Sequence, residues 1–292
     1  MQAADDAVTV VQKQEPLLIW DGLAPGETVV SFGDPLPPRD SDVPTITRVE
    51  KVRTPSIDAF VPENPNGTAV VILPGGGFKV VVPDLEGSEA AAWLNRLGIT
   101  VFVLRYRTNE VTPINESNFL RPLQDSQRAV RWVRFNAKRW KLNPDRVGVL
   151  GFSAGGQVAS ILHTSHEDAA YEPIDDIDKI SFRPDFSLLI YPWNVLPQNS
   201  ESLLPELQFR KGLPPAFIVH TSDDNSSAAG AAMIYIGLKK MGVPAELHIY
   251  ENGGHGYGVR PRPNSNIGSW TDRATEWLAR RSDTNSIALN EQ

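Results

Sequence analysis

One serine in the sequence lies where its hydroxyl group could act as a nucleophile. Gly151-Phe152-Ser153-Ala154-Gly155 follows the apolar segment 147–150 and opens a segment with helical periodicity. A serine on a sharp strand-to-helix turn needs very small residues two positions before and after it, and the turn exposes its hydroxyl group. The helix start directs amide groups and the positive end of the helix dipole toward the reaction centre. The motif predicts Ser153 as a nucleophile; the alternative is a glycine-rich turn in which the serine caps the helix.

A second glycine-rich segment could stabilise the charge that such an attack creates. Pro74-Gly75-Gly76-Gly77-Phe78 follows the apolar run 68–73. Backbone amides are preorganised donors for a developing alkoxide, and glycines let the chain approach the substrate closely. We expect the amides of Gly76, Gly77 and Ala154 to form an oxyanion hole. Without the serine motif, an ordinary glycine-rich turn would be the better interpretation.

A serine nucleophile needs a base, and the base needs an orienting carboxylate. His255 lies in the glycine-rich segment 251–258, after the last predicted strand, where a loop could place an imidazole over the sheet edge. His220 and His248 fall in strand-like runs and are expected in or beside the core. His163 and His166 have a spacing that weakly resembles a metal pair, but we favour a helix-end cluster and predict no metal site.

The orienting carboxylate should come between the serine and the histidine in the chain. Two candidates, Asp223 and Asp224, follow the strand-like run 216–220. We favour Asp224 because it lies four residues past the strand, where the chain should have turned toward the site. Asp223 would then support the loop or cap a helix, and the choice between the two stays open.

Strand-like and helix-like segments alternate from residue 68 onward. Strands are predicted over 46–52, 57–61, 68–73, 99–105, 147–150, 187–191, 216–220 and 246–250. Helices are predicted over 85–97, 123–140, 154–163, 228–240 and 270–280. Runs that are apolar throughout indicate a sheet covered on both faces, and the alternation indicates parallel strands with right-handed crossovers. The predicted fold is therefore an α/β protein with a mostly parallel central sheet, and no connection is long enough for a large lid domain.

We divide the 292 residues into three parts. Residues 1–45 are rich in proline and turns and predict an irregular leader on the surface. Residues 46–281 form the predicted α/β catalytic domain, and residues 282–292 form a polar tail.

The composition excludes several function classes. The chain has no cysteine, which rules out disulfides, thiolate catalysis and cysteine-ligated zinc. A net charge of −7 and the lack of a basic patch argue against nucleic acid binding. The densest basic stretch, from Arg128 to Lys141, has helical spacing and predicts a solvated helix face. No apolar run approaches the roughly 18 residues of a membrane helix, and the N-terminus lacks the features of a signal peptide.

Four stretches together resemble the α/β-hydrolase superfamily over about residues 46–281: 73–78, 151–156, Asp223-Asp224 and 253–258. The closer likeness is to bacterial esterases grouped with acetyl xylan and feruloyl esterases, near the hormone-sensitive-lipase-like branch. The segments 20–26 and 241–250 are similar too. Pro74 stands where lipase-like relatives have histidine, which favours the carbohydrate esterases. The turn Asn225-Ser226-Ser227 departs from the pattern that follows the acid in relatives.

This resemblance implies a serine esterase that removes short acyl groups, such as acetyl, from carbohydrate esters such as acetylated xylan. It implies no metal or organic cofactor, and often secretion or a periplasmic location; a cytoplasmic location stays open. Ser153, His255 and Asp224 would be the catalytic residues. Phe152 and Trp193 could shape the substrate pocket, although aromatic core packing explains them equally well. Alternatives are a general short-chain carboxylesterase, a feruloyl esterase, a peptidase or a non-catalytic binding protein on the same scaffold. The oligomeric state is not indicated.

Overall fold

An eight-stranded sheet runs through the part of the chain that the computed structural model describes, residues 16–109, 116–165 and 168–282. The strand order is β1-β4-β6-β5-β7-β8-β9-β10. The strands are β1 (Leu17–Leu18), β4 (Ser56–Phe60), β5 (Ala69–Leu73), β6 (Thr100–Arg105), β7 (Val147–Phe152), β8 (Ser187–Ile190), β9 (Ala216–Thr221) and β10 (Ala245–Tyr250). Neighbours from β6 to β10 pair in parallel, whereas β1 and β4 pair antiparallel at one edge.

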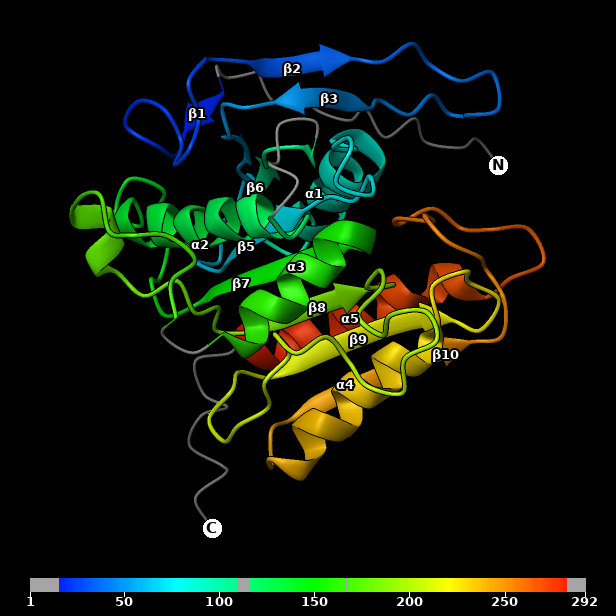
Figure 1. The fold of residues 1–292 in the computed structure, drawn as a ribbon. Helices are drawn as coiled ribbons and strands as arrows, with labels where there is room; N and C mark the ends of the chain where they lie inside the picture. The colour runs from blue at the N-terminus through cyan, green and yellow to red at the C-terminus, as the bar shows by residue number, and fades with distance from the viewer. Residues whose placement is uncertain (1–15, 110–115, 166–167, 283–292) are drawn as a thin grey trace.

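Helices cover both faces of this sheet (Figure 1). They are α1 (Glu89–Asn95), α2 (Leu120–Phe135), α3 (Ser153–Thr164), α4 (Ala228–Lys240) and α5 (Trp270–Ser282). All five residues of β5 are buried, and they alternate between two apolar clusters. Val71 and Leu73 belong to the cluster that includes residues of α2, α3 and α4, whereas Val70 and Ile72 belong to the cluster that includes residues of α1 and α5. The predicted α/β fold with helices on both faces is therefore confirmed, and the described residues contain no large lid domain.

Most predicted elements lie where the sequence indicates, with two differences at helix boundaries. The predicted helix over 85–97 divides into a π-helical turn, Asp84–Ser88, and α1. The helix predicted over 123–140 lies nearer the N-terminus. α2 begins at Leu120 and stops at Phe135, and the chain then continues in tight turns. No helix within the described ranges is long and apolar enough to cross a membrane.

The described part of the predicted leader differs from the expected irregular surface segment. β1 extends the main sheet by pairing with β4, and β2 (Phe32–Pro35) forms a separate two-stranded sheet with β3 (Val49–Val52). Ile19 and Trp20 are buried in the core, and the indole of Trp20 donates a hydrogen bond to Asp125 in α2 at 3.1 Å. Residue 46 is thus no structural boundary. Residues 1–15 and 283–292 lie outside the described residues.

The prediction of a solvated basic face on α2 was wrong for its two most buried arginines. Arg128 is 1% exposed and Arg131 is 6% exposed. Arg128 forms ion pairs with Asp175 and Asp178 and donates a hydrogen bond to the carbonyl group of Ile19. The cause is the turn around residues 175–179, which packs its acidic side chains against α2. Lys138, Arg139 and Lys141 are exposed, as predicted.

Candidate active site

Ser153 lies at the junction between β7 and α3, at the carboxyl end of the parallel strands. Its φ angle of 53° is in the left-handed region, which is strained for a residue with a side chain. The flanking glycines make this turn possible. A Cβ atom at Gly151 would lie 2.3 Å from the carbonyl oxygen of Gly155, and one at Gly155 would lie 2.0 Å from that of Leu73. The sequence motif thus matches a local steric requirement.

The structure brings Ser153, His255 and Asp224 into one chain of contacts. Ser153 Oγ lies 2.6 Å from Nε2 of His255, and Nδ1 of His255 lies 2.6 Å from Oδ2 of Asp224. A carboxylate offers only acceptors, so Nδ1 carries the proton toward Asp224, and Nε2 is left to accept from the serine hydroxyl group. The Asp224 side chain is fully buried, and its Oδ1 accepts a hydrogen bond from the amide of Ser226 at 2.8 Å.

The neighbouring Asp223 binds the backbone of the loop that carries His255 and does not bind the imidazole. Its carboxylate accepts hydrogen bonds from the amides of Gly254 at 2.9 Å and Gly253 at 3.1 Å. These backbone hydrogen bonds lower the pKa of Asp223 below its ordinary value. The hydrogen bond from Gly254 has the larger effect on the pKa. The two adjacent aspartates therefore have different contacts: Asp224 touches the ring of His255, and Asp223 touches the backbone just before it.

Gly76 and Gly77 line the same hollow as Ser153, with a volume of about 320 Å³. Both have positive φ angles, 129° and 62°, which favour glycine. The hollow is lined by Ile46, Arg48, Gly76, Gly77, Val82, Leu85, Glu86, Ser153, Trp193, His255 and Gly256. Ala154 is buried in the first turn of α3, where the backbone amides have no acceptor within the helix. Three predicted donor residues therefore lie beside or next to the serine.

The two aromatic residues predicted at the pocket differ in position. Trp193 lines the hollow, is 38% exposed, and its ring centre lies 5.4 Å from that of His255. Phe152 is fully buried and packs in the core against Tyr191 and Trp270, outside the hollow. Because Phe152 ends β7, its side chain follows the strand alternation into the apolar cluster shared with α5.

The other described histidines form no hydrogen bond with Ser153, His255 or Asp224, although His220 comes within 3.9 Å of Asp224. His220 is buried at the end of β9, as predicted for a core residue, and burial lowers its pKa. His163 is buried too; desolvation lowers its pKa to about 3, and Nδ1 lies 2.9 Å from the Ser187 hydroxyl group. His248 is half-buried on β10, and His166 lies outside the described residues. Among the described residues, no group of histidines and carboxylates has the arrangement of a metal site.

Two further residues contact the site, Glu86 and Tyr191, and no motif in the sequence indicates them. Glu86 is 4% exposed, and burial raises its pKa. Its Oε2 accepts a hydrogen bond from the amide of Gly75 at 2.7 Å, and its Oε1 accepts one from the Tyr191 hydroxyl group at 2.8 Å. The available signal was weak: a glutamate at the start of a helical pattern normally faces solvent.

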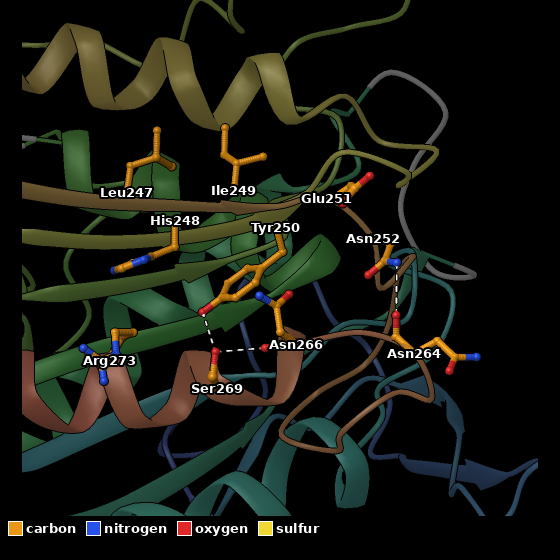
Figure 2. Close-up of a pocket in the computed structure, with 10 residues that line it drawn as sticks. All are labelled: Leu247, His248, Ile249, Tyr250, Glu251, Asn252, Asn264, Asn266, Ser269 and Arg273. Atoms are coloured by element: carbon orange, nitrogen blue, oxygen red, sulfur yellow. Dashed lines mark hydrogen bonds between the residues drawn. The ribbon is translucent and has the colours of Figure 1, made fainter.

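A larger hollow of about 650 Å³ lies elsewhere, between β10 and the start of α5 (Figure 2). It is lined by Leu247, His248, Ile249, Tyr250, Glu251, Asn252, Asn264, Asn266, Ser269 and Arg273. The hydroxyl groups of Tyr250 and Ser269 lie 3.3 Å apart. The side-chain amide of Asn252 donates a hydrogen bond to the backbone carbonyl group of Asn264. None of its lining residues belongs to the serine–histidine–aspartate contacts, so the chemistry is to be sought in the smaller hollow.

The match to a family model covers the nucleophile and the glycine loop. Residues 57–187 match the BD-FAE family model. The acetylxylan esterase of Xylanibacter ruminicola is 33% identical over 223 residues, which are 68% of this chain and 43% of that protein. The chain therefore spans less than half the length of this relative.

Solved structures with similar folds agree with this match. The acetyl ester-xyloside bifunctional hydrolase from Caldicellulosiruptor lactoaceticus superposes with a TM-score of 0.71 at 28% identity, over 94% of this chain and 98% of that chain. MGS-M1, an α/β hydrolase from a Medee basin deep-sea metagenome library, has a TM-score of 0.65 at 25% identity, over 82% of this chain and 98% of that chain. The chain has the α/β-hydrolase fold. Within it, the chain resembles the bacterial acetylxylan esterases and their carbohydrate esterase relatives.

Proposed function

We propose that this protein is a serine esterase that removes short acyl groups, above all acetyl, from carbohydrate esters such as acetylated xylan. The observation that carries this proposal is the unbroken contact from Ser153 through His255 to Asp224, facing a hollow bordered by Gly76 and Gly77. The likeness to an acetylxylan esterase and to an acetyl ester-xyloside hydrolase supports the carbohydrate ester as substrate class.

The proposed reaction proceeds through an acyl-enzyme. Ser153 Oγ attacks the ester carbonyl carbon while its proton moves to Nε2 of His255, and Asp224 stabilises the imidazolium ion. The amides of Gly76, Gly77 and Ala154 would donate hydrogen bonds to the oxyanion. As the intermediate collapses, His255 gives the proton to the leaving sugar oxygen, which departs as an alcohol. A water molecule, deprotonated by His255, then attacks the acyl-enzyme and releases the carboxylic acid and free Ser153.

The walls of the hollow suit a small acyl group. They include the apolar side chains of Val82, Leu85 and Trp193. A methyl group can be desolvated against these walls, and the described residues hold no large lid domain that would cover a long acyl chain. We also propose that the enzyme acts outside the cytoplasm, since a xylan polymer does not cross a membrane; cell fractionation of the source organism would test this.

Acetate release from acetylated xylan, measured beside hydrolysis of p-nitrophenyl acetate, tests the proposal. The wild-type protein should act on both substrates, and Ser153→Ala should act on neither. Activity on the aryl ester alone would replace the carbohydrate substrate with that of a general short-chain carboxylesterase. Release of ferulate from feruloylated xylan, faster than release of acetate, would indicate a feruloyl esterase. Inactivity of the wild-type protein on every ester would refute the esterase proposal.

A further inference from the structure

A buried carboxyl group lies beside the proposed catalytic residues and takes no part in the proton transfer between them. Glu86 belongs to the π-helical turn Asp84–Ser88 and is one of the residues that line the catalytic hollow. Single π-helical turns are rare and frequently occur at functional sites. Taking a carboxyl group out of water is costly unless hydrogen bonds compensate for it. The two hydrogen bonds that Glu86 accepts therefore account for its position.

These two hydrogen bonds connect the two loops that flank the serine. The first comes from the amide of Gly75, directly before the predicted oxyanion residues Gly76 and Gly77. The second comes from the hydroxyl group of Tyr191, just past the end of β8. The same hydroxyl oxygen accepts a hydrogen bond from the amide of Gly258 at 2.9 Å, three residues after His255. A continuous path of hydrogen bonds thus joins the glycine loop to the histidine loop through Glu86 and Tyr191.

The packing around this path is tight. A Cβ atom at Gly75 would lie 2.5 Å from Oε2 of Glu86 and 2.7 Å from the Cβ atom of Ser153. The ring centre of Tyr191 lies 5.0 Å from that of His255 in an edge-on arrangement. Tyr191 also has a φ angle of 38°, an unfavourable conformation for a tyrosine. Such strain persists only where the surroundings hold the residue firmly.

We propose that Glu86 is a positioning residue for the reaction. Its carboxyl group, acting through the Gly75 amide and the Tyr191 hydroxyl group, sets the distance between the oxyanion loop and the histidine loop. The amides of the oxyanion loop and the imidazole of His255 are then correctly placed around the tetrahedral intermediate on Ser153. This inference rests on the proposed esterase function, because it assigns Glu86 a role in the same reaction.

The expected signature is a loss of kcat with little change in KM. The oxyanion exists only in the transition state and the intermediate, so a misplaced donor weakens binding of those species and leaves ground-state binding intact. Displacements of about 1 Å caused by remote changes can lower rates by about 100-fold. We expect a decrease of about 10- to 100-fold in kcat, with KM within about twofold of the wild type.

Two variants interrupt the path at different points. Glu86→Gln keeps the size of the side chain but replaces one acceptor oxygen with an amino group, so one of the two donors loses its partner. Tyr191→Phe removes the hydroxyl group and leaves both Glu86 and the Gly258 amide without it. Because both changes break one path, the double variant should lose little more kcat than the worse single variant. Affinity for a trifluoromethyl ketone, which forms an oxyanion adduct with the serine, should fall by the same factor as kcat.

Tyr171→Phe is the matched control. The hydroxyl group of Tyr171 donates to the carboxylate of Asp178 at 2.6 Å in a buried pair outside the catalytic hollow. This variant should show a comparable loss of thermal stability with unchanged kcat. The proposal is overturned if Glu86→Gln and Tyr191→Phe keep wild-type kcat, or if Tyr171→Phe loses kcat as they do.

Hydrogen exchange separates this inference from the esterase proposal. Amides in segments 74–78 and 256–259 should exchange faster in Glu86→Gln than in the wild type, whatever substrate the protein uses. Unchanged exchange in both segments would refute the connection between the loops even in an active esterase. Conversely, faster exchange in a protein that hydrolyses no ester would sustain the connection and refute the proposed function, which Ser153→Ala tests on its own.

Discussion

Nδ1 of His220 lies 3.9 Å from Oδ2 of Asp224, the oxygen that His255 contacts at 2.6 Å. Desolvation by burial lowers the pKa of His220, so its ring stays neutral at neutral pH. A second cation beside the carboxylate would weaken its attraction for an imidazolium ion. Because His220 is neutral, it does not compete with His255 for the negative charge of Asp224. The carboxylate can therefore stabilise the imidazolium ion of His255, as a serine–histidine–aspartate mechanism needs.

Asp224→Asn should lower kcat by about 10³- to 10⁴-fold, because an asparagine no longer fixes the imidazole tautomer. Asp223→Asn is the matched control, since the Asp223 carboxylate accepts hydrogen bonds from the backbone amides of Gly253 and Gly254, whereas Asp224 contacts the imidazole. We expect it to cost less than about tenfold, typical of a neutral replacement that keeps one acceptor. Rates on p-nitrophenyl acetate measure both, and a larger loss in Asp223→Asn would exchange the two roles.

Gly76→Ala and Gly77→Ala should differ sharply. A Cβ atom at Gly76 would lie 2.1 Å from the carbonyl oxygen of Val80, so the loop must move. Loss of an oxyanion donor typically costs about 10²- to 10³-fold in kcat, and we expect that loss in Gly76→Ala. A Cβ atom at Gly77 meets no atom within 4 Å, and only its positive φ angle opposes it, at a cost of about 1–2 kcal/mol in stability. Steady-state kinetics with thermal unfolding would distinguish them; equal kcat values would contradict this assignment.

Trp193→Ala should widen the range of accepted acyl groups. The indole borders the hollow next to His255, so its removal opens space beside the serine. We expect the ratio of kcat/KM for p-nitrophenyl butyrate to that for the acetate to rise about tenfold, since each desolvated methylene group contributes about 0.8 kcal/mol. A ratio equal to that of the wild type would show that Trp193 does not limit acyl length.

Arg128→Ala should destabilise the fold, although the basic stretch looks solvated in the sequence. Removing the guanidinium group leaves buried Asp178 short of a partner and frees the carbonyl group of Ile19. Breaking a buried ion pair costs about 3–5 kcal/mol in the free energy of unfolding. Exposed Lys138→Ala, on the same stretch, should change it by less than about 0.5 kcal/mol. Urea unfolding of both variants provides the comparison, and equal effects would argue against a stabilising role for the buried pairs.

His163 should make the fold sensitive to acid. Burial lowers the pKa of His163 from 6.5 to about 3, so the folded state binds its proton less readily than the unfolded state. Its contribution to stability is fully present above pH 6.5 and is lost as the pH falls toward 3. Over that window the free energy of unfolding should fall by up to about 1.4 kcal/mol per pH unit more steeply in the wild type than in His163→Gln. Urea unfolding between pH 7 and pH 4 measures the slopes; parallel slopes would show that His163 is not the group responsible.

The fold could be predicted because its strands are apolar throughout and separated by helices with clear periodicity. β5 illustrates this: all of its residues are apolar and all are buried. β1 and β2 escaped prediction because they are short and lie in a proline-rich segment, where pairing with β4 and β3 decides the structure. The burial of Arg128 depends on a turn 47 residues further along the chain, which helical spacing cannot indicate.

The site divides in the same way. Ser153, Gly76 and His255 have glycine neighbours, which indicate unusual backbone conformations. The local sequence therefore points to these three residues. Glu86 gives no such signal, because its contact with Tyr191 joins residues separated by 105 positions. Phe152 shows the opposite limitation: its place within the serine motif suggested the pocket, whereas the strand alternation directs its ring into the core.

The anchoring of the N-terminal segment affects how the chain must fold as it is synthesised. Trp20 contacts Asp125 and Ile19 contacts Arg128, at sequence separations of 105 and 109 residues. Ile19 and Trp20 therefore leave the ribosome long before α2 exists to cover them. We expect nascent chains that end before α2 to present these two apolar residues to chaperones, and release from the chaperone to await the emergence of that helix.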